Sequence, residues 1–127
     1  MKISLKIVIA SPRYVIAQGV SSIFKEISNE IIFVSSDQDS LERLLIKVNP
    51  ALVIIDDFDL VFKPEKTIAF LSFLKPAKTV ILSDKIQRDK VELLERVGVC
   101  QFFSSFITQP QIHDLLDAVA FGKRFYD

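Results

Sequence analysis

An acidic side chain and a hydroxyl side chain each follow an apolar segment of the sequence. Asp56 comes directly after Leu52–Ile55, and Ser83 comes directly after Val80–Leu82. A carboxylate in this position must lie at the rim of its segment, because burial without a partner would cost several kcal/mol. If the two segments are neighbouring strands of one sheet, the Asp56 carboxylate and the Ser83 hydroxyl come close together and mark a site for chemistry.

A divalent cation is one ligand that carboxylates gathered in this way could hold. Asp57 and Asp84 could complete a metal site with Asp56, and Asp84 is the better placed because it follows Ser83 directly. The simpler interpretation is that Asp57 and Asp84 are ordinary loop acids and that Asp56 is a solvated strand-end acid capping nearby backbone amides. We favour it and predict no metal site, with Asp56 and Asp84 as weak candidates.

Other catalytic patterns are missing from the sequence. The single cysteine, Cys100, and the single histidine, His113, form no cluster that suits zinc, and no spacing supports a Ser-His-Asp set. The turn Ala10–Arg13, after the first apolar run, has no glycine that could cradle a phosphate. We therefore expect no enzyme, and a small nucleotide- or flavin-binding enzyme is the least favoured function.

Short apolar runs rich in β-branched residues predict the strands. Runs without polar alternation are typical of strands whose two faces are both covered, as in a parallel sheet. They are Ile7–Ala10, Ile31–Val34, Leu52–Ile55 and Val80–Leu82, with Gln101–Phe103 as a weaker fifth.

Apolar residues with helical spacing fill the gaps between these runs. Pro64–Leu74 is expected to be a helix with a less regular pattern. Ser11-Pro12 can cap and open the first helix, and Thr108 and Gln111 fit a capping box at the last. The four stripes are Ile16, Val20, Ile23, Phe24 and Ile27; Leu41, Leu44, Leu45 and Val48; Val91, Leu94 and Val97; and Ile112, Leu115, Leu116 and Val119.

Strands that alternate with helices predict an α/β fold. We expect a three-layer, doubly wound (βα)5 parallel sheet with helices on both faces, formed by one domain over residues 1–127. In such a sheet, function gathers at the carboxyl ends of the strands, where Asp56 and Ser83 lie.

The balance of positive and negative side chains limits the kinds of partner that the chain could attract by charge. Sixteen Lys and Arg balance sixteen Asp and Glu, so no overall positive field attracts nucleic acid or an anionic membrane. The N-terminal apolar run Ile7–Ala10 is too short for a signal peptide or a membrane span. With one cysteine and no internal disulfide, we expect a cytoplasmic protein in a reducing compartment.

Five segments carry a family resemblance by their order and spacing, although none is specific by itself. They are Lys6–Ala10, Pro50–Asp56, Val80–Ser83, Gly98–Phe103 and Leu116–Phe125. With them the whole chain, nearly without gaps, resembles a response-regulator receiver domain of the LuxR-type subfamily. The resemblance implies receiver, or flavodoxin-like, topology.

The resemblance also implies roles for three residues of this chain. The phosphorylated aspartate of the family falls on Asp56, and the switch hydroxyl that meets the phosphoryl group falls on Ser83. The aromatic switch residue of the fifth strand falls on Phe102, which is an allowed type. The central acceptor and both switch positions are therefore present.

Three other positions depart from the family pattern. The adjacent acidic pair that helps to hold magnesium falls on Ser11 and Pro12, and the lysine after the fifth strand falls on Ser105. Magnesium is usually held by one or two carboxylates together with phosphate, and phosphoryl transfer depends on cations that neutralise the equatorial oxygens. The resemblance thus points to a degenerate receiver that keeps the fold but is a poor phosphoryl acceptor. No cofactor is expected, and Mg²⁺ only if the altered site still binds it.

The function expected from this resemblance is signalling through protein–protein contacts. The chain would be the regulatory domain of a LuxR-type DNA-binding response regulator, with a protein partner or a homodimer, and with a histidine kinase upstream; a natural stand-alone protein fits equally well. DNA contact would come only through a further domain after Asp127. The alternative is a receiver that is still phosphorylated on Asp56 by means of an altered metal site.

Overall fold

The computed structural model describes residues 6–27, 31–58, 61–71, 78–84, 91–92, 96, 99–104 and 107–121 of the chain. Two predicted features fall elsewhere. Ser105 lies outside the described residues, as do Leu94 and Val97 of the third apolar stripe, whose first residue, Val91, is helical.

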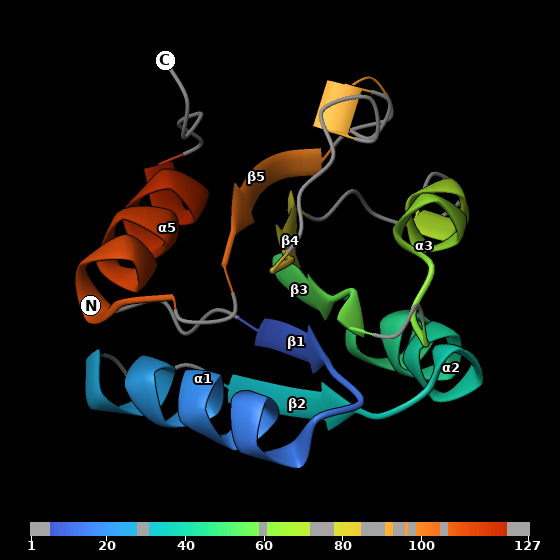
Figure 1. Cartoon of the computed structure of the whole chain (residues 1–127), viewed down its shortest axis with the longest axis horizontal. Helices are drawn as coiled ribbons and strands as arrows, with labels where there is room; N and C mark the ends of the chain where they lie inside the picture. Colours follow the sequence, from blue (N-terminus) through green and yellow to red (C-terminus); the bar gives the residue numbers. More distant parts are fainter. Residues whose placement is uncertain are drawn as a thin grey trace.

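Every predicted strand is present. The five strands are β1 (Lys6–Ala10), β2 (Ile31–Ser35), β3 (Leu52–Asp56), β4 (Lys78–Leu82) and β5 (Val99–Phe103). They form one parallel sheet in the order β2-β1-β3-β4-β5, which is the flavodoxin-like order (Figure 1). Strand β3 is central, and its residue Val53 lies opposite Val8 of β1 and Thr79 of β4.

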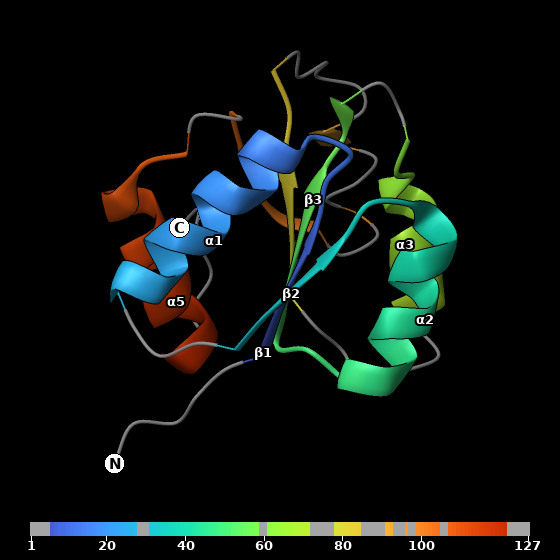
Figure 2. The same ribbon diagram turned by 90° about the horizontal axis from the view of Figure 1, so that it is seen from below.

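The predicted helices cover both faces of this sheet. They are α1 (Tyr14–Ile27), α2 (Gln38–Val48), α3 (Pro64–Leu71) and α5 (Gln109–Phe121). Helices α1 and α5 lie on one side of the sheet, and α2 and α3 lie on the other (Figure 2). The expected three-layer α/β architecture is therefore confirmed.

Local signals in the sequence define two helix ends. The predicted capping box at α5 forms, because the Gln111 backbone N–H donates to Thr108 Oγ1 at 3.3 Å and the Thr108 N–H donates to Gln111 Oε1 at 2.9 Å. Helix α2 ends at Asn49, whose φ of 55° is left-handed. Asparagine is one of the few residues other than glycine that adopts this conformation readily.

Two apolar clusters fill the space between the layers. Alternate residues of the strands point to opposite faces, so Ile54 contacts the α1/α5 side and Ile55 the α2/α3 side. Phe24, from the first predicted stripe, is fully buried in the α1/α5 cluster, and Leu41 and Leu45, from the second, are fully buried in the α2/α3 cluster.

Phe62 shows how the chain between β3 and α3 closes the second cluster. Phe62 is fully buried in the α2/α3 cluster, whereas its neighbour Val61 is 38% exposed. A loop residue has no periodicity that could place it in the core, so its burial follows from tertiary packing alone.

None of the described helices combines the length and the apolar character that crossing a membrane would need.

We predict that Phe62→Ala lowers the free energy of unfolding by about 3–5 kcal/mol, because it leaves a cavity among fully buried side chains. The matched control is Val61→Ala, which changes it by no more than about 0.5 kcal/mol at an exposed position. Urea denaturation of both variants measures the difference. Equal losses would show that Phe62 does not anchor this loop to the core.

Candidate functional site

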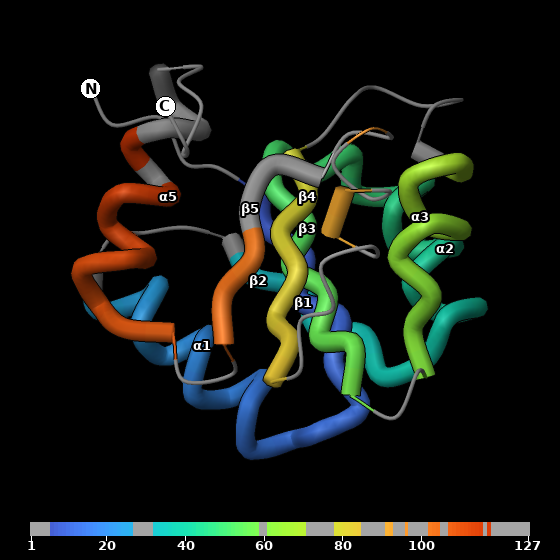
Figure 3. The backbone as a smooth tube through the Cα atoms, turned by 45° about the horizontal axis from the view of Figure 1, so that its top comes forward, coloured from blue at the N-terminus to red at the C-terminus, as the bar shows by residue number. Residues whose placement is uncertain are grey.

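The candidate site lies at the carboxyl edge of the sheet. Strands β3, β4 and β5 run in the same direction and end along one edge, beside the turn that leads from β1 into α1 (Figure 3). Asp56 is the last residue of β3 and pairs with Leu82, the last residue of β4. Ser83 follows Leu82, so the expectation that Asp56 and Ser83 end neighbouring strands is confirmed.

Asp56 is a buried residue and not the solvated strand-end acid that the simpler interpretation expected. Its exposed fraction is 0%, and that of its side chain is 1%. Asp56 continues the alternation of Leu52 and Ile54 in β3, which faces the α1/α5 side. A carboxylate buried to this extent needs a partner that compensates for its lost hydration.

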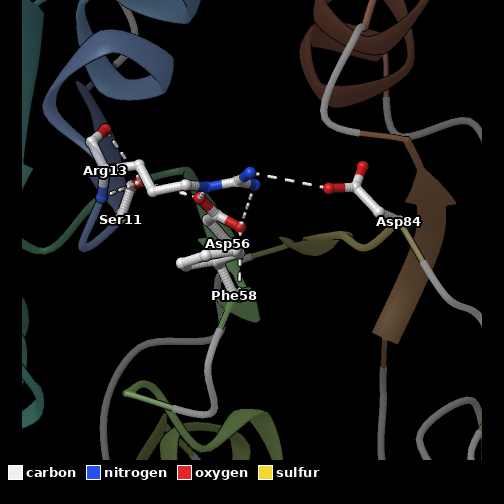
Figure 4. A network of polar contacts seen from close by, with 5 residues as sticks. All are labelled: Ser11, Arg13, Asp56, Phe58 and Asp84. Carbon is white, nitrogen blue, oxygen red and sulfur yellow. Dashed lines mark hydrogen bonds and ion pairs between the residues drawn. The ribbon is translucent and has the colours of Figure 1, made fainter.

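Arg13 is that partner. Its Nε donates to Asp56 Oδ2 at 2.9 Å and its Nη2 donates to Asp56 Oδ1 at 2.8 Å (Figure 4). Both oxygens of the carboxylate are thus bound by the two prongs of one guanidinium. This bidentate geometry is the strongest form of ion pair between protein side chains, because each hydrogen bond is assisted by full charges.

Two further donors complete the environment of the carboxylate. The Ser11 hydroxyl donates to Asp56 Oδ2 at 2.8 Å, and the Phe58 backbone N–H donates to Oδ1 at 3.1 Å. The Ser11 hydroxyl also lies 3.2 Å from the Arg13 carbonyl, but it has one hydrogen, and the shorter contact to an anion is the stronger. The prediction that Asp56 caps a nearby backbone amide is confirmed at Phe58.

Arg13 makes two more contacts that fix its position. Its Nη1 lies 3.5 Å from Asp84 Oδ2, and its Cζ lies 4.4 Å from the centre of the Phe58 ring (Figure 4). The guanidinium therefore lies between two carboxylates and against an aromatic face, which a cation favours. The hydrogen bond to Asp56 raises the pKa of Arg13 above its ordinary value.

The turn between β1 and α1 aims Arg13 at Asp56. The Arg13 backbone N–H donates to Ser11 Oγ at 3.0 Å, and its carbonyl accepts from the Ala17 N–H at 3.0 Å. The helical hydrogen bonds of α1 therefore begin at the Arg13 carbonyl. Ser11-Pro12 was expected to open this helix, and this is wrong: α1 starts at Tyr14, and the Ser11 hydroxyl is committed to Asp56.

The two predicted switch residues take different places. Ser83 is buried, and its backbone N–H donates to the Phe103 carbonyl at 2.8 Å, which fixes it to β5. Phe102 lies opposite Ile81 of β4 and packs against the α2/α3 cluster.

The backbone N–H of Asp57 donates to the Leu82 carbonyl at 3.1 Å, which prolongs the pairing of β3 and β4 beyond Asp56.

Sequence reasoning missed Arg13. The sequence predicted a helix start at Ser11-Pro12 and showed that Ala10–Arg13 lacks glycine and acidic residues, but it gave Arg13 no role. The available signal was a cation three residues beyond the end of a buried strand, at the edge where Asp56 had to lie. The interpretation of Asp84 as an ordinary loop acid is also wrong, because its carboxylate faces the Arg13 guanidinium.

The oxygen atoms at this site do not form a set of ligands that fits a magnesium ion. Within the described ranges, no group of three or more acidic, histidine or cysteine side chains could hold a metal. Magnesium requires oxygen ligands in an octahedron, but the lone pairs of Asp56 already accept four hydrogen bonds, two of them from a cation. The side chain of Ser11 offers only a neutral oxygen, and the side chain of Pro12 has no oxygen.

No family model and no curated protein sequence matches the chain. Solved structures do match over nearly its whole length. A LuxR-family two-component response regulator from Aurantimonas sp. SI85-9A1 superposes with a TM-score of 0.81 at 13% identity, over 96% of this chain and 89% of that one. The signal receiver domain of a response regulator from Bermanella marisrubri gives 0.80 at 13% identity, over 93% and 99%.

A response regulator from Thermotoga maritima is as similar, with a TM-score of 0.80 at 9% identity, over 92% of this chain and 98% of that one. The chain therefore has the receiver fold. In the receiver fold observed here, Asp56 ends the central strand as the resemblance implied, while an arginine from the β1–α1 turn holds it.

We predict that Arg13→Ala lowers the free energy of unfolding by about 3 kcal/mol, the low end for a broken buried pair, because a quarter of the Arg13 side chain is exposed. A double-mutant cycle with Asp56→Asn should give a coupling of about 1–3 kcal/mol. Arg43→Ala, at an exposed position of α2, is the control and should change stability by no more than about 0.5 kcal/mol. Additive losses would contradict the ion pair.

The pH dependence of this pair follows from the raised pKa of Arg13. A cation whose pKa is higher in the folded state contributes stability that is fully present below its ordinary pKa, and that is lost only as the pH rises through the raised value. The contribution of the Arg13 charge should therefore stay constant between about pH 6 and about pH 9. Urea denaturation of wild type and Arg13→Ala across this range measures it.

Proposed function

We propose that the chain is a two-component receiver module that signals through protein–protein contacts, and that its phosphorylation on Asp56 is impaired. The receiver fold supports the first part. The observation that carries the second is the bidentate ion pair in which Arg13 binds both carboxylate oxygens of Asp56.

A phosphoryl acceptor needs a carboxylate oxygen that can approach the phosphorus atom. In this chain Oδ2 accepts from Arg13 Nε and the Ser11 hydroxyl, and Oδ1 accepts from Arg13 Nη2 and the Phe58 N–H. An attack by either oxygen must first break charge-assisted hydrogen bonds in a buried site. The ion pair thus lowers the energy of the unmodified acid and raises the barrier to its modification.

Exposed apolar side chains support a role in protein contacts. Tyr14 and Val15 at the start of α1 are 77% and 78% exposed, and Ile46 on α2 is 61% exposed. Phe58 and Val61, in the segment between β3 and α3, are exposed beside the site. Exposed apolar residues that lie next to one another, as Tyr14 and Val15 do in sequence, are the kind from which partner contact surfaces are built, whereas a single exposed apolar residue such as Ile46 is ordinary.

The wider setting that we propose is a regulator of the LuxR type. The module would pass a state to a DNA-binding output domain, by contact with a protein partner or by dimerisation, and a histidine kinase would act upstream. Balanced charge in the receiver supports this division of labour, since a domain with sixteen positive and sixteen negative side chains has no general attraction for DNA.

We predict that the protein gains no phosphoryl group when it is incubated with acetyl phosphate and Mg²⁺ and then weighed by mass spectrometry. Asp56→Asn, which keeps the size of the side chain but cannot form the acyl phosphate, is the matched control, and both proteins should keep their mass. A gain of one phosphoryl group in the wild type that Asp56→Asn abolishes would establish instead a receiver that is phosphorylated through an altered site.

A further inference from the structure

We infer that the Arg13 guanidinium is a built-in cation, which takes the place of a divalent metal ion between Asp56 and Asp84 and keeps such ions out. The inference concerns the site of the proposed function, and it rests on that function for the expectation that a divalent ion would otherwise bind there. It adds a physical reason why a divalent ion would not bind at this edge of the sheet.

Charge is the first step of the argument. The guanidinium lies within 2.8 Å of Asp56 Oδ1 and 3.5 Å of Asp84 Oδ2. One positive charge therefore already faces both carboxylates that the sequence offered as metal ligands. A magnesium ion that entered would meet this charge at close range. Water screens little at the Asp56 side chain, which is 1% exposed, and more at the Asp84 side chain, which is 46% exposed.

Geometry is the second step. A planar guanidinium uses the in-plane lone pairs of a carboxylate, which are the same lone pairs that a metal ion needs. Arg13 Nε and Nη2 take one on each oxygen of Asp56, while the Ser11 hydroxyl and the Phe58 N–H take another on each. A metal ion could bind Asp56 only after Arg13 had left it.

Connectivity is the third step. Arg13 belongs to the turn between β1 and α1, Asp56 to the end of β3, and Asp84 to the segment after β4. The guanidinium thus joins a turn, a strand end and a loop that are far apart in sequence, and the Phe58 ring lies against it at 4.4 Å. Because the cation is covalently attached, its local concentration is fixed by the fold and cannot be lowered by removing a free ion.

The removal of the guanidinium should uncover a divalent-ion site. In Arg13→Ala, Asp56 loses its charged partner, and Asp84, an exposed residue whose carboxylate faces the same guanidinium, loses that contact as well. Magnesium is usually bound by one or two carboxylates, which Asp56 and Asp84 would supply here, and by waters or phosphate oxygens at its other positions. We expect Arg13→Ala to bind Mg²⁺ at least about tenfold more tightly than the wild type, and its melting temperature to rise on addition of the ion.

The experiment compares thermal unfolding in EDTA and in MgCl₂ at equal ionic strength, with calorimetric titration of MgCl₂ for the affinity. The wild type should show no shift, and Arg13→Ala should show one. Arg13→Ala/Asp56→Asn is the matched control and should lose the shift. Arg13→Gln, which keeps a long side chain with donors but removes the charge, should also gain Mg²⁺ binding and serves if Arg13→Ala does not fold.

Two results would overturn the inference. One is binding of Mg²⁺ by the wild type that Asp56→Asn abolishes, because the guanidinium would then not keep the ion out. The other is failure of both Arg13→Ala and Arg13→Gln to bind more Mg²⁺ than the wild type. Neither measurement uses a phosphodonor, so a wild type that gains a phosphoryl group without binding Mg²⁺ would refute the proposed function and leave this inference intact.

Discussion

The burial of one carboxylate constrains the whole carboxyl edge of this sheet. Asp56 ends the central strand with no exposed surface, and an ion in that position is stable only if a counter-charge and further donors replace its water. Arg13, Ser11 and the Phe58 amide supply them from two different segments. The path of the β1–α1 turn and that of the chain after β3 are both fixed by this requirement.

The fold was predictable because its signals are local. Each predicted run lies inside the strand that forms, one or two residues shorter than it, and the Thr108–Gln111 capping box placed the start of α5 within the sequence itself. The parallel arrangement followed from the alternation of strands and helices. Phe62 lay beyond this reasoning, because a residue in a connecting segment enters a core only when distant parts of the chain have been brought together.

The site was predictable only in its acidic half. Asp56 and Ser83 could be placed because both stand at strand ends, and the strand order then makes them neighbours. Arg13 is 43 residues from Asp56 in sequence, and a long cationic side chain near a strand end is by default read as solvated. Its pairing with Asp56 depends on how the arginine side chain extends from one segment to another, and no periodic pattern in the sequence indicates this. For the same reason the sequence predicts Ser11 as a helix cap, although its hydroxyl binds Asp56, which is distant in sequence.

Charge balance connects the substitutions in this site with one another. The pattern implied by the resemblance combines three carboxylates with a divalent ion and a lysine, and its charges cancel. Here Ser11 and Pro12 carry no charge, and Asp56, the one fully buried carboxylate among the described residues, is paired with the guanidinium of Arg13, which also faces the partly exposed Asp84. Had the acidic pair remained, one arginine could not have neutralised three acids; had a metal ion remained beside Arg13, the site would have carried excess positive charge at low dielectric. Under the proposed function, the uncharged Ser11 and Pro12 and the arginine that follows them therefore form one electrostatic solution, in which the cation belongs to the chain.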